Sequence, residues 1–171
     1  MINKPIKITF IFAFFILMVI PTKASADTKQ VQLTIKAEVK NLSKLELNTT
    51  TISFDVGSLS PDDAPIISSP STQISLVCKA RAGGNNKITL TVMATNDLAS
   101  GSDVISINNI NWIATGTGFI NGTMDKTSSQ TIGTWTGSGV RSGSITFGLV
   151  NRWEYARGEY GTTALFTLTT P

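Results

Sequence analysis

The chain has 171 residues, with 14 lysines and arginines, 11 aspartates and glutamates and no histidine. Without histidine, a Ser-His-Asp or Cys-His catalytic arrangement and a histidine-containing zinc site are excluded. The single cysteine, Cys78, excludes an intramolecular disulfide and a thiolate cluster. Most hydrolytic mechanisms are thereby removed, so we expect a protein that is not an enzyme and needs no cofactor.

The first 26 residues have the pattern of a cleaved export signal. Lys4 and Lys7 precede an apolar run over residues 8–20, and small residues at 24–26 allow cleavage before Asp27. The apolar run is shorter than a comfortable membrane span. We therefore expect export without stable membrane insertion.

Cleavage would change the charge of the protein. Lys4, Lys7 and Lys23 leave with the signal, so the remaining chain carries 11 basic and 11 acidic residues and no net charge. The basic character of the whole chain is then a property of the leader alone. No nucleic-acid partner and no anionic membrane partner is expected.

Residues 27–40 contain the clearest periodicity of the chain. Apolar side chains occupy every second position and polar side chains lie between them, which is typical of a half-buried strand over residues 30–40. The apolar positions are Val31, Leu33, Ile35, Ala37 and Val39. The pattern leaves open whether this strand fills a groove in its own domain or in a neighbouring copy.

Residues 41–171 have the composition of an all-β domain, rich in Thr, Ser, Gly, Asn, Val and Ile and without an apolar helical period. A bend is expected at 41–43, followed by a strand over 45–56 that is interrupted near Asn48. Three prolines in 57–72 predict an irregular connection.

The next strand is predicted over 73–80, with Cys78 on its apolar face. Glycines and asparagines at 83–86 predict a hairpin turn into a strand over 87–95. The alternation makes Cys78 a buried thiol, with an intermolecular bridge or a reactive thiol as the alternatives.

The remaining pattern is one of further short strands. They are predicted over 104–114 with a bulge near 108–109, over 115–124, 131–136 and 144–150, and finally over 160–169, with a flexible turn at 137–143 and a polar link at 151–159. This spacing of short strands indicates a single β-sandwich domain.

Side chains able to carry chemistry are few. The acidic pairs Asp62-Asp63 and Glu154/Glu159 lie in predicted loops and are interpreted as solvated surface charge. Trp153 and Tyr155, in the polar link, are the candidates for an exposed aromatic contact with carbohydrate.

Four short motifs together resemble the spore coat protein U-like domain of archaic (Csu-like) chaperone-usher pilins. They are the alternating N-terminal strand, the segment 52–61, the segment 74–78 and Gly158-Glu-Tyr160 ahead of a Thr-rich final strand. The chain departs from the family pattern where Asp55 and Val56 separate Phe54 from Gly57, and where a cysteine near 41–43 is missing.

The resemblance implies an immunoglobulin-like antiparallel β-sandwich that lacks one strand until a partner supplies it. The alternating apolar side chains of residues 27–40 would be the donated knobs, and Tyr160, Phe166 and Leu168 would line the acceptor groove. The partners would be other copies or related subunits, a periplasmic assembly chaperone and an outer-membrane usher. The protein would pass through the periplasm to a fibre at the cell surface.

We therefore expect a non-enzymatic, exported structural subunit of a surface fibre (pilus) or coat, assembled by donor-strand exchange. The alternative is a self-complemented β-sandwich adhesin or carbohydrate-binding module, in which residues 30–40 form the first strand of their own domain.

Overall fold

The computed structural model describes residues 29–68 and 72–171, so the leader predicted over residues 1–26 lies outside the described part. Contacts divide the chain into two units, Met1–Ala37 and Glu38–Pro171. None of residues 29–41 belongs to a helix or strand. The strand predicted over 30–40 is thus not formed, because a strand exists only where its main chain shares hydrogen bonds with a partner.

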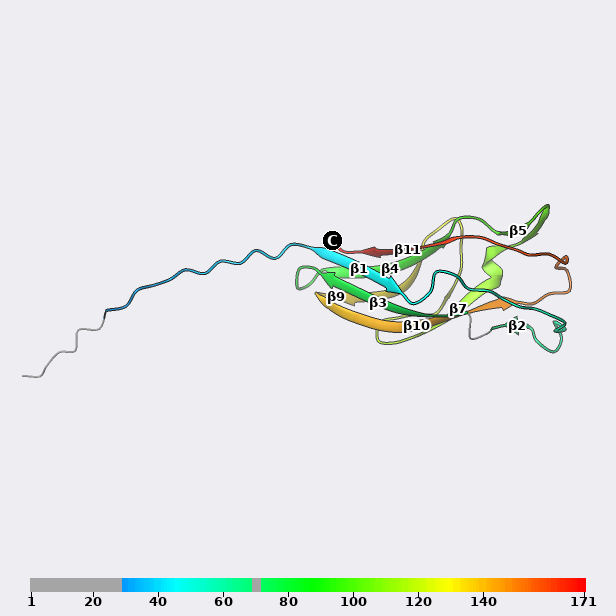
Figure 1. Ribbon diagram of the computed structural model, residues 1–171, viewed down its shortest axis with the longest axis horizontal. Coiled ribbons are helices and arrows are strands. Elements are labelled where there is room, and N and C mark those ends of the chain that lie inside the picture. Colours follow the sequence, from blue (N-terminus) through cyan, green and yellow to red (C-terminus); the bar gives the residue numbers. More distant parts are fainter. Residues whose placement is uncertain (1–28, 69–71) are drawn as a thin grey trace, which may run out of the picture. The chain divides into compact units, whose positions relative to one another are not determined.

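The second unit is an all-β sandwich of antiparallel sheets, as its composition predicts (Figure 1). The larger sheet has the order β1-β3-β10-β7-β8, with β2 paired to β10, and the smaller sheet has the order β11-β4-β9. β5 and β6 form a separate two-stranded sheet.

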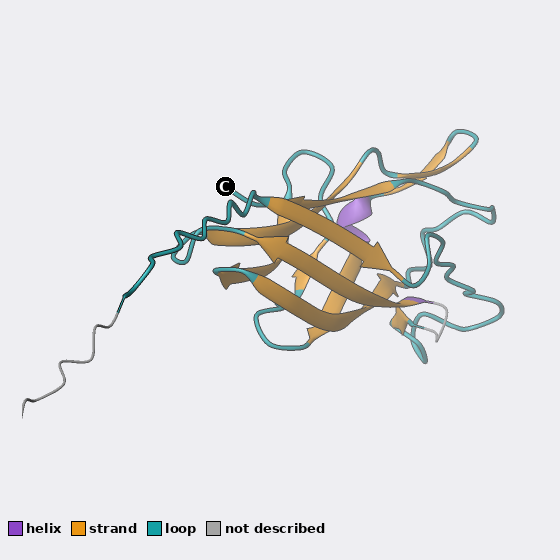
Figure 2. Ribbon diagram, turned by 60° about the vertical axis from the view of Figure 1, so that its left-hand side comes forward, coloured by secondary structure: helices purple, strands orange, loops and turns teal. Residues whose placement is uncertain are grey.

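The elements have the following bounds: β1 Leu42–Leu47, β2 Ile66–Ile67, β3 Gln73–Arg81, β4 Lys87–Ala94, β5 Leu98–Ser100, β6 Asp103–Ile105, the 3-10 helix η2 Ile107–Asn109, β7 Ile110–Thr115, β8 Gly122–Thr123, β9 Gln130–Thr136, β10 Gly139–Val150 and β11 Ala164–Thr169. Figure 2 shows the strands of the sandwich and the short helix η2.

The core lies between the sheets and follows the period-two pattern of the strands. In β3 and β4, alternate side chains are buried and the intervening ones are exposed or half-buried. Leu76, Leu90 and Val92 are completely buried. Burial of such a side chain stabilises the fold by roughly 1.5–3 kcal/mol, so this alternation fixes which face of each strand turns inward.

The hairpin predicted around 83–86 is wrong, because β3 and β4 belong to different sheets. β3 pairs with β1 and β10, whereas β4 pairs with β11 and β9. Both strands bury an apolar row, and the two rows face the same core from opposite sheets. Residues 82–86 therefore cross from one sheet to the other.

Two predicted irregularities also differ from the structure. Residues 107–109 form η2 rather than a bulge, and the side chain of Asp97 accepts a hydrogen bond from the N–H of Ile107 at 3.0 Å. The turn predicted over 137–143 is confined to 137–138, because β10 begins at Gly139. Gly137 turns the chain with a φ of +72°, which L-residues rarely adopt.

The strand predicted over 45–56 is shorter and begins earlier. β1 covers Leu42–Leu47, including part of the predicted bend, and residues 48–56 belong to no strand. Asn48 ends the pairing of β1 with β3. Its N–H donates to the carbonyl oxygen of Ser75 in β3 at 3.2 Å, and its side-chain oxygen accepts from the N–H of Ser75 at 2.8 Å. The strand predicted over 115–124 is reduced to β8.

The sandwich has two ends, which we call proximal and distal. The proximal end holds the start of β1, the connections 82–86 and 137–138 and the chain end, where the Asn41 side chain donates to the carbonyl oxygen of Pro171 at 2.8 Å. The distal end holds the connections 48–65, 95–109 (with β5, β6 and η2), 124–129 and 151–163. In Figure 1 the label C marks the proximal end, and β2 and β5 lie at the distal end.

Candidate functional site: the open seam between β1 and β11

The seam between the sheets on the side of β1 and β11 is open. β1 is the last strand of the larger sheet and β11 the last strand of the smaller one, so each presents an edge that has no ladder partner among the described residues. The two strands lie beside each other (Figure 1), yet no strand pairing joins them in the described residues. Unpaired edge strands of this kind are templates for pairing with another chain.

Apolar side chains point from both edges toward this seam and are incompletely covered. Leu45 and Leu47 of β1 oppose Cys78 and Leu76 of β3, so they face the core side of their sheet. Phe166 and Leu168 of β11 do the same opposite Val92 and Leu90 of β4. All four of these edge side chains are only half-buried, although they pack against the core.

The segment 48–56, which follows β1, carries another half-buried apolar row. Ile52, Phe54 and Val56 alternate with exposed residues and pack against the core, although this segment is in no strand. The alternation predicts a strand here. The structure shows instead an extended stretch that covers part of the core without strand pairing.

The opposite side of the sandwich is sealed by the connection 116–121. The N–H of Ile120 donates to the carbonyl oxygen of Ile132 at 2.7 Å, and the N–H of Thr134 donates to that of Gly118 at 3.0 Å. Phe119 packs edge-on against Trp135, with ring centroids 5.0 Å apart. This side therefore has no comparable apolar opening.

Two buried tryptophans hold the sealing connection in place. The indole N–H of Trp112 donates to the carbonyl oxygen of Ile120, and that of Trp135 donates to the carbonyl oxygen of Thr117, both at 2.8 Å. Their exposed fractions are 2% and 7%. Both rings thus belong to the core and are unavailable for stacking on a sugar.

The apolar row predicted for donation is highly exposed. The exposed fractions are 96% for Val31, 81% for Leu33, 84% for Ile35 and 73% for Val39, and Ala37 is exposed as well. Four large apolar side chains at alternate positions of one segment are an unusual surface feature for a soluble protein. The segment has the side-chain period of a strand, but it pairs with no strand in the part of the chain that the structure describes.

Of the three residues predicted for the acceptor groove, two lie on β11 and one does not. Phe166 and Leu168 lie on β11 at the open seam, but Tyr160 does not, because β11 begins only at Ala164. The Tyr160 hydroxyl donates to the carbonyl oxygen of Ala156 at 2.9 Å, which ties Tyr160 into the connection 151–163 instead.

The sequence alone does not assign Leu45 and Leu47 to the groove. Their alternation is visible, but only the strand order makes β1 an edge strand, and only its contacts with β11 place the two edges together. No local signal in the sequence gives that neighbourhood.

The two predicted aromatic contacts also differ in exposure. Trp153 is 68% exposed, and its indole N–H makes a long hydrogen bond of 3.5 Å to a carboxylate oxygen of Asp62. Tyr155 is half-buried and packs against the core, and burial raises the pKa of its hydroxyl. The two rings therefore do not form one exposed platform.

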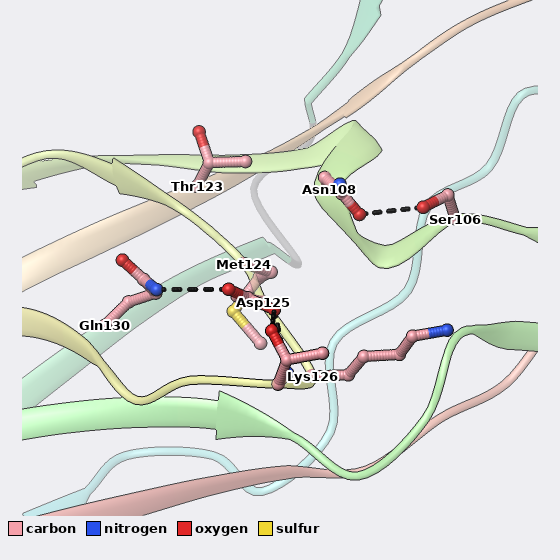
Figure 3. A pocket seen from close by; sticks show the side chains of 8 residues that line it. Ser106, Asn108, Thr123, Met124, Asp125, Lys126 and Gln130 are labelled. Carbon is pink, nitrogen blue, oxygen red and sulfur yellow. Dashed lines mark hydrogen bonds between the residues drawn. The ribbon is translucent and has the colours of Figure 1, made fainter.

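A polar hollow of about 470 Å³ lies at the distal end, next to Asp125 (Figure 3). The Asp125 carboxylate accepts hydrogen bonds from the Thr127 N–H (2.8 Å), the Thr127 and Ser128 hydroxyls (2.8 and 2.7 Å) and the Gln130 amide (3.4 Å). These bonds lower the pKa of Asp125 to about 2, first of all the one from the Thr127 main chain. The carboxylate is thus occupied in closing its own loop.

Cys78 is a buried member of the core, as its alternation with Ile74 and Leu76 predicts. It is 2% exposed, and burial raises the pKa of its thiol to about 11. A thiol that stays protonated and covered is a poor nucleophile.

Within residues 29–68 and 72–171, no group of three or more acidic or cysteine side chains gathers as metal ligands would. The same residues contain no helix long and apolar enough to cross a membrane.

Comparison with known proteins gives no further assignment. No model of a known protein family matches the sequence, and no match is found among curated proteins. The likeness to the spore coat protein U-like domain accordingly stays a prediction from the motifs that carry it.

Proposed function

We propose that this protein is a non-enzymatic, exported structural subunit of a surface fibre or coat, and that its copies join by donor-strand exchange. The observation that carries the proposal is a pair of complementary features in one chain. An exposed apolar row with the period of a strand lies over residues 31–39, and an open apolar seam lies between β1 and β11.

The seam has the properties that strand insertion requires. The edge of β11 offers free main-chain donors and acceptors, and the half-buried side chains beside it offer an apolar floor. An inserted strand would satisfy the main-chain groups of the edge, and its alternate side chains would fill the floor. Insertion would also remove an edge that otherwise invites uncontrolled aggregation.

The donor row supplies an apolar driving force for insertion. Burying a Val, Leu or Ile side chain contributes roughly 1.5–3 kcal/mol, and four such side chains are exposed in this segment. Its apolar positions are two residues apart, so all of them point to one face of an extended chain. The segment contains no proline, and each of its residues can therefore share main-chain hydrogen bonds.

The chemistry of the seam and of the donor row makes another copy of the chain, or a related subunit, the primary partner, which provides the groove or the strand. Two further partners are implied only by the resemblance to archaic chaperone-usher pilins. A periplasmic chaperone would cover the seam before assembly, and an outer-membrane usher would exchange the chaperone for the next subunit. The export signal predicted at residues 1–26 would bring the chain to that compartment.

A substitution pair on the donor row tests the proposal. Ile35→Asp would bury an unpaired carboxylate in the groove, so we expect the chain to lose polymer formation after refolding. Lys36→Asp changes the neighbouring polar position and is the matched control, and it should polymerise as the unsubstituted chain does. Equal polymerisation of both variants, measured by light scattering, would count against insertion of this row.

A carbohydrate-binding module is the second candidate, and the exposed ring of Trp153 favours it. In that case Trp153→Ala should abolish retention on an immobilised polysaccharide, while Ile35→Asp should leave retention intact. In a fibre subunit without lectin activity, neither the unsubstituted chain nor the variants are retained.

A further inference from the structure

The charged side chains of residues 41–171 are sorted between the two ends of the sandwich. The distal connections carry eight carboxylates: three in 48–65, two in 95–109, one in 124–129 and two in 151–163. They carry only three cations, one in 124–129 and two in 151–163, so this end has a net charge of −5.

The proximal half has the opposite sign. Five cations and one carboxylate lie in the strands near this end, which gives a net charge of +4. These residues are Lys44, Lys79, Arg81, Lys87 and Arg141, with Glu46. The Glu46 carboxylate pairs with Lys44 and Lys79, while Lys126 pairs with Asp97 at the distal end. Each ion pair joins residues of the same end, so no pair neutralises the excess charge of either end.

Exposed apolar side chains occur in the same distal region as the acids. Leu59, Ile66 and Trp153 are 52%, 53% and 68% exposed. Main-chain contacts bring their segments together near Asn151. The Asn151 side-chain amide donates to the carbonyl oxygens of Leu59 and Ala64, both at 3.2 Å, and Ile66 pairs with Val150. Exposed apolar side chains with charged residues around them are typical of a protein–protein contact.

We propose that this distal surface is a second subunit contact, and that its partner is the basic proximal end of the next copy. The proposal rests on donor-strand exchange for the link between the copies. Only three residue steps separate Val39, the last knob, from Leu42, the first residue of β1. They span about 10 Å at most. A donor copy must therefore hold its proximal end against the acceptor end at which Val39 leaves the groove.

The direction of insertion decides which acceptor end that is. β11 runs from the distal end, at Ala164, to the proximal end, at Thr169. A strand inserted antiparallel to β11 leaves the groove at the distal end, and antiparallel pairing is slightly the more stable arrangement. Parallel insertion would bring two basic proximal ends together, so the charge distribution also favours the antiparallel direction.

The contact repeats without closing. Each copy offers one acidic and one basic end, so the same head-to-tail junction forms at every step and extends a fibre. Attraction between the ends would also speed the encounter of two copies before the strand inserts. The exposed apolar side chains of the distal end, Trp153 among them, thereby acquire a role in docking.

Cross-linking of assembled polymers tests the geometry. Leu59→Cys marks the distal end and Asn85→Cys marks the proximal end, while the native thiol of Cys78 is buried and does not interfere. In mixed polymers, a short thiol-specific linker should join the two kinds of copy to each other. Predominant cross-linking of Asn85→Cys copies with one another would mean that proximal ends meet, and would overturn the proposal.

Charge reversal tests the attraction. Asp63→Lys/Glu154→Lys/Glu159→Lys changes the distal end from −5 to +1, and Arg81→Glu/Lys87→Glu/Arg141→Glu changes the proximal end from +4 to −2. At low salt we expect the distal variant to join unsubstituted donors at least about tenfold more slowly. The distal variant should join donors that carry the proximal variant faster than it joins unsubstituted donors. A rate independent of both variants and of salt would overturn the proposal.

A neutral peptide of residues 30–39 separates this proposal from donor-strand exchange itself. The peptide fills the groove without bringing a sandwich domain, so the distal variant should bind it as tightly as the unsubstituted chain does. Intact peptide binding together with slower joining of whole chains supports the end-to-end contact. Intact peptide binding with unchanged joining contradicts the contact alone, whereas a chain that neither binds the peptide nor polymerises contradicts strand exchange as well.

Discussion

Single side chains of the core and of the distal loops give the most local tests. Cys78 lies on the inner face of β3, and burial raises the pKa of its thiol to about 11. An ordinary thiol has a pKa near 8.5. The native thiol should therefore carry very little thiolate at neutral pH, and its cover excludes reagents as well.

We expect Cys78 to react with a thiol-specific reagent at least about a hundredfold more slowly in the native protein than in concentrated guanidinium. Following the absorbance of the released chromophore measures both rates. Rapid labelling of the native chain would show that β1 and β3 open readily around this residue.

Asp125 gives a test by pH. Its pKa is lowered to about 2 by hydrogen bonds from the Thr127 main chain and neighbouring hydroxyls, against an ordinary value of about 3.9 in the unfolded chain. A carboxyl group with a lowered native pKa stabilises the fold above the unfolded value, and this contribution is lost as the pH falls through the native value.

The melting temperature should accordingly be lower for Asp125→Asn than for the unsubstituted chain at neutral pH, and the difference should shrink between about pH 4 and pH 2. Asp63→Asn, an exposed carboxyl group of the connection 48–65, is the matched control. A difference that stays constant down to pH 2 would show that the Asp125 bonds do not depend on its charge.

At the scale of strands and connections, the sealed side of the sandwich depends on close approach at glycine. A Cβ added to Gly133 of β9 would lie 2.5 Å from the ring of Trp135, whereas one added to Gly84 would meet nothing within 4 Å. The ring is itself held by its hydrogen bond to Thr117. It therefore has little freedom to move away.

We expect Gly133→Ala to lower the free energy of unfolding by about 1–3 kcal/mol, the usual cost of overpacking a core. Gly84→Ala is the control in the connection 82–86, and it should change the stability much less. Denaturant titration measures both. Equal stability of the two variants would mean that the connection 116–121 is packed more loosely than the structure has it.

The strands that bury a complete apolar row were predictable from the sequence, and their partners were not. β3 lies within one residue of its predicted range, because Ile74, Leu76, Cys78 and Ala80 alternate without interruption. The same pattern cannot tell whether the next strand pairs with β3 or faces it across the core. The predicted hairpin at 83–86 failed for this reason.

The turn and the bulge predicted from glycines and asparagines were wrong for a similar reason. Gly139 and Gly143 lie inside β10, where Gly143 is kept small by the close carbonyl group of Thr115 and the ring of Phe119. The asparagines at 108–109 belong to η2, where the N–H of Ile107 donates to the side chain of Asp97, ten residues earlier in the same connection. Both causes are contacts formed in the folded chain, and the pattern of neighbouring residues does not show them.

For the candidate site, only the donor side of the interaction could be predicted from the sequence. The alternating row of residues 31–39 is a local pattern and could be identified directly. Phe166 and Leu168 came from the resemblance, and the position of β11 beside β1 could be established only from the contacts between the two strands. Tyr160 was misplaced, because the chain enters β11 four residues later.

At the scale of the whole molecule, one chain carries an exposed apolar row, an open apolar seam, and ends of opposite charge. In a self-complemented domain, residues 30–40 would form the first strand and fill the groove of their own sandwich. In the structure, residues 29–41 form no strand. Strand exchange and end-to-end docking would act together, since insertion antiparallel to β11 also brings the proximal end of one copy to the distal end of another.

The most direct test is the mass of the chain as a function of concentration. The chain from Asp27 onward is refolded alone and measured by light scattering after size-exclusion chromatography, beside a chain that lacks residues 27–40. We predict that the longer chain forms linear polymers whose mass rises with concentration, and that the shorter chain forms none but still binds the peptide of residues 30–39. A stable monomer of the longer chain at every concentration, together with unfolding of the shorter chain, would contradict donor-strand exchange and identify residues 30–40 as a strand of their own domain.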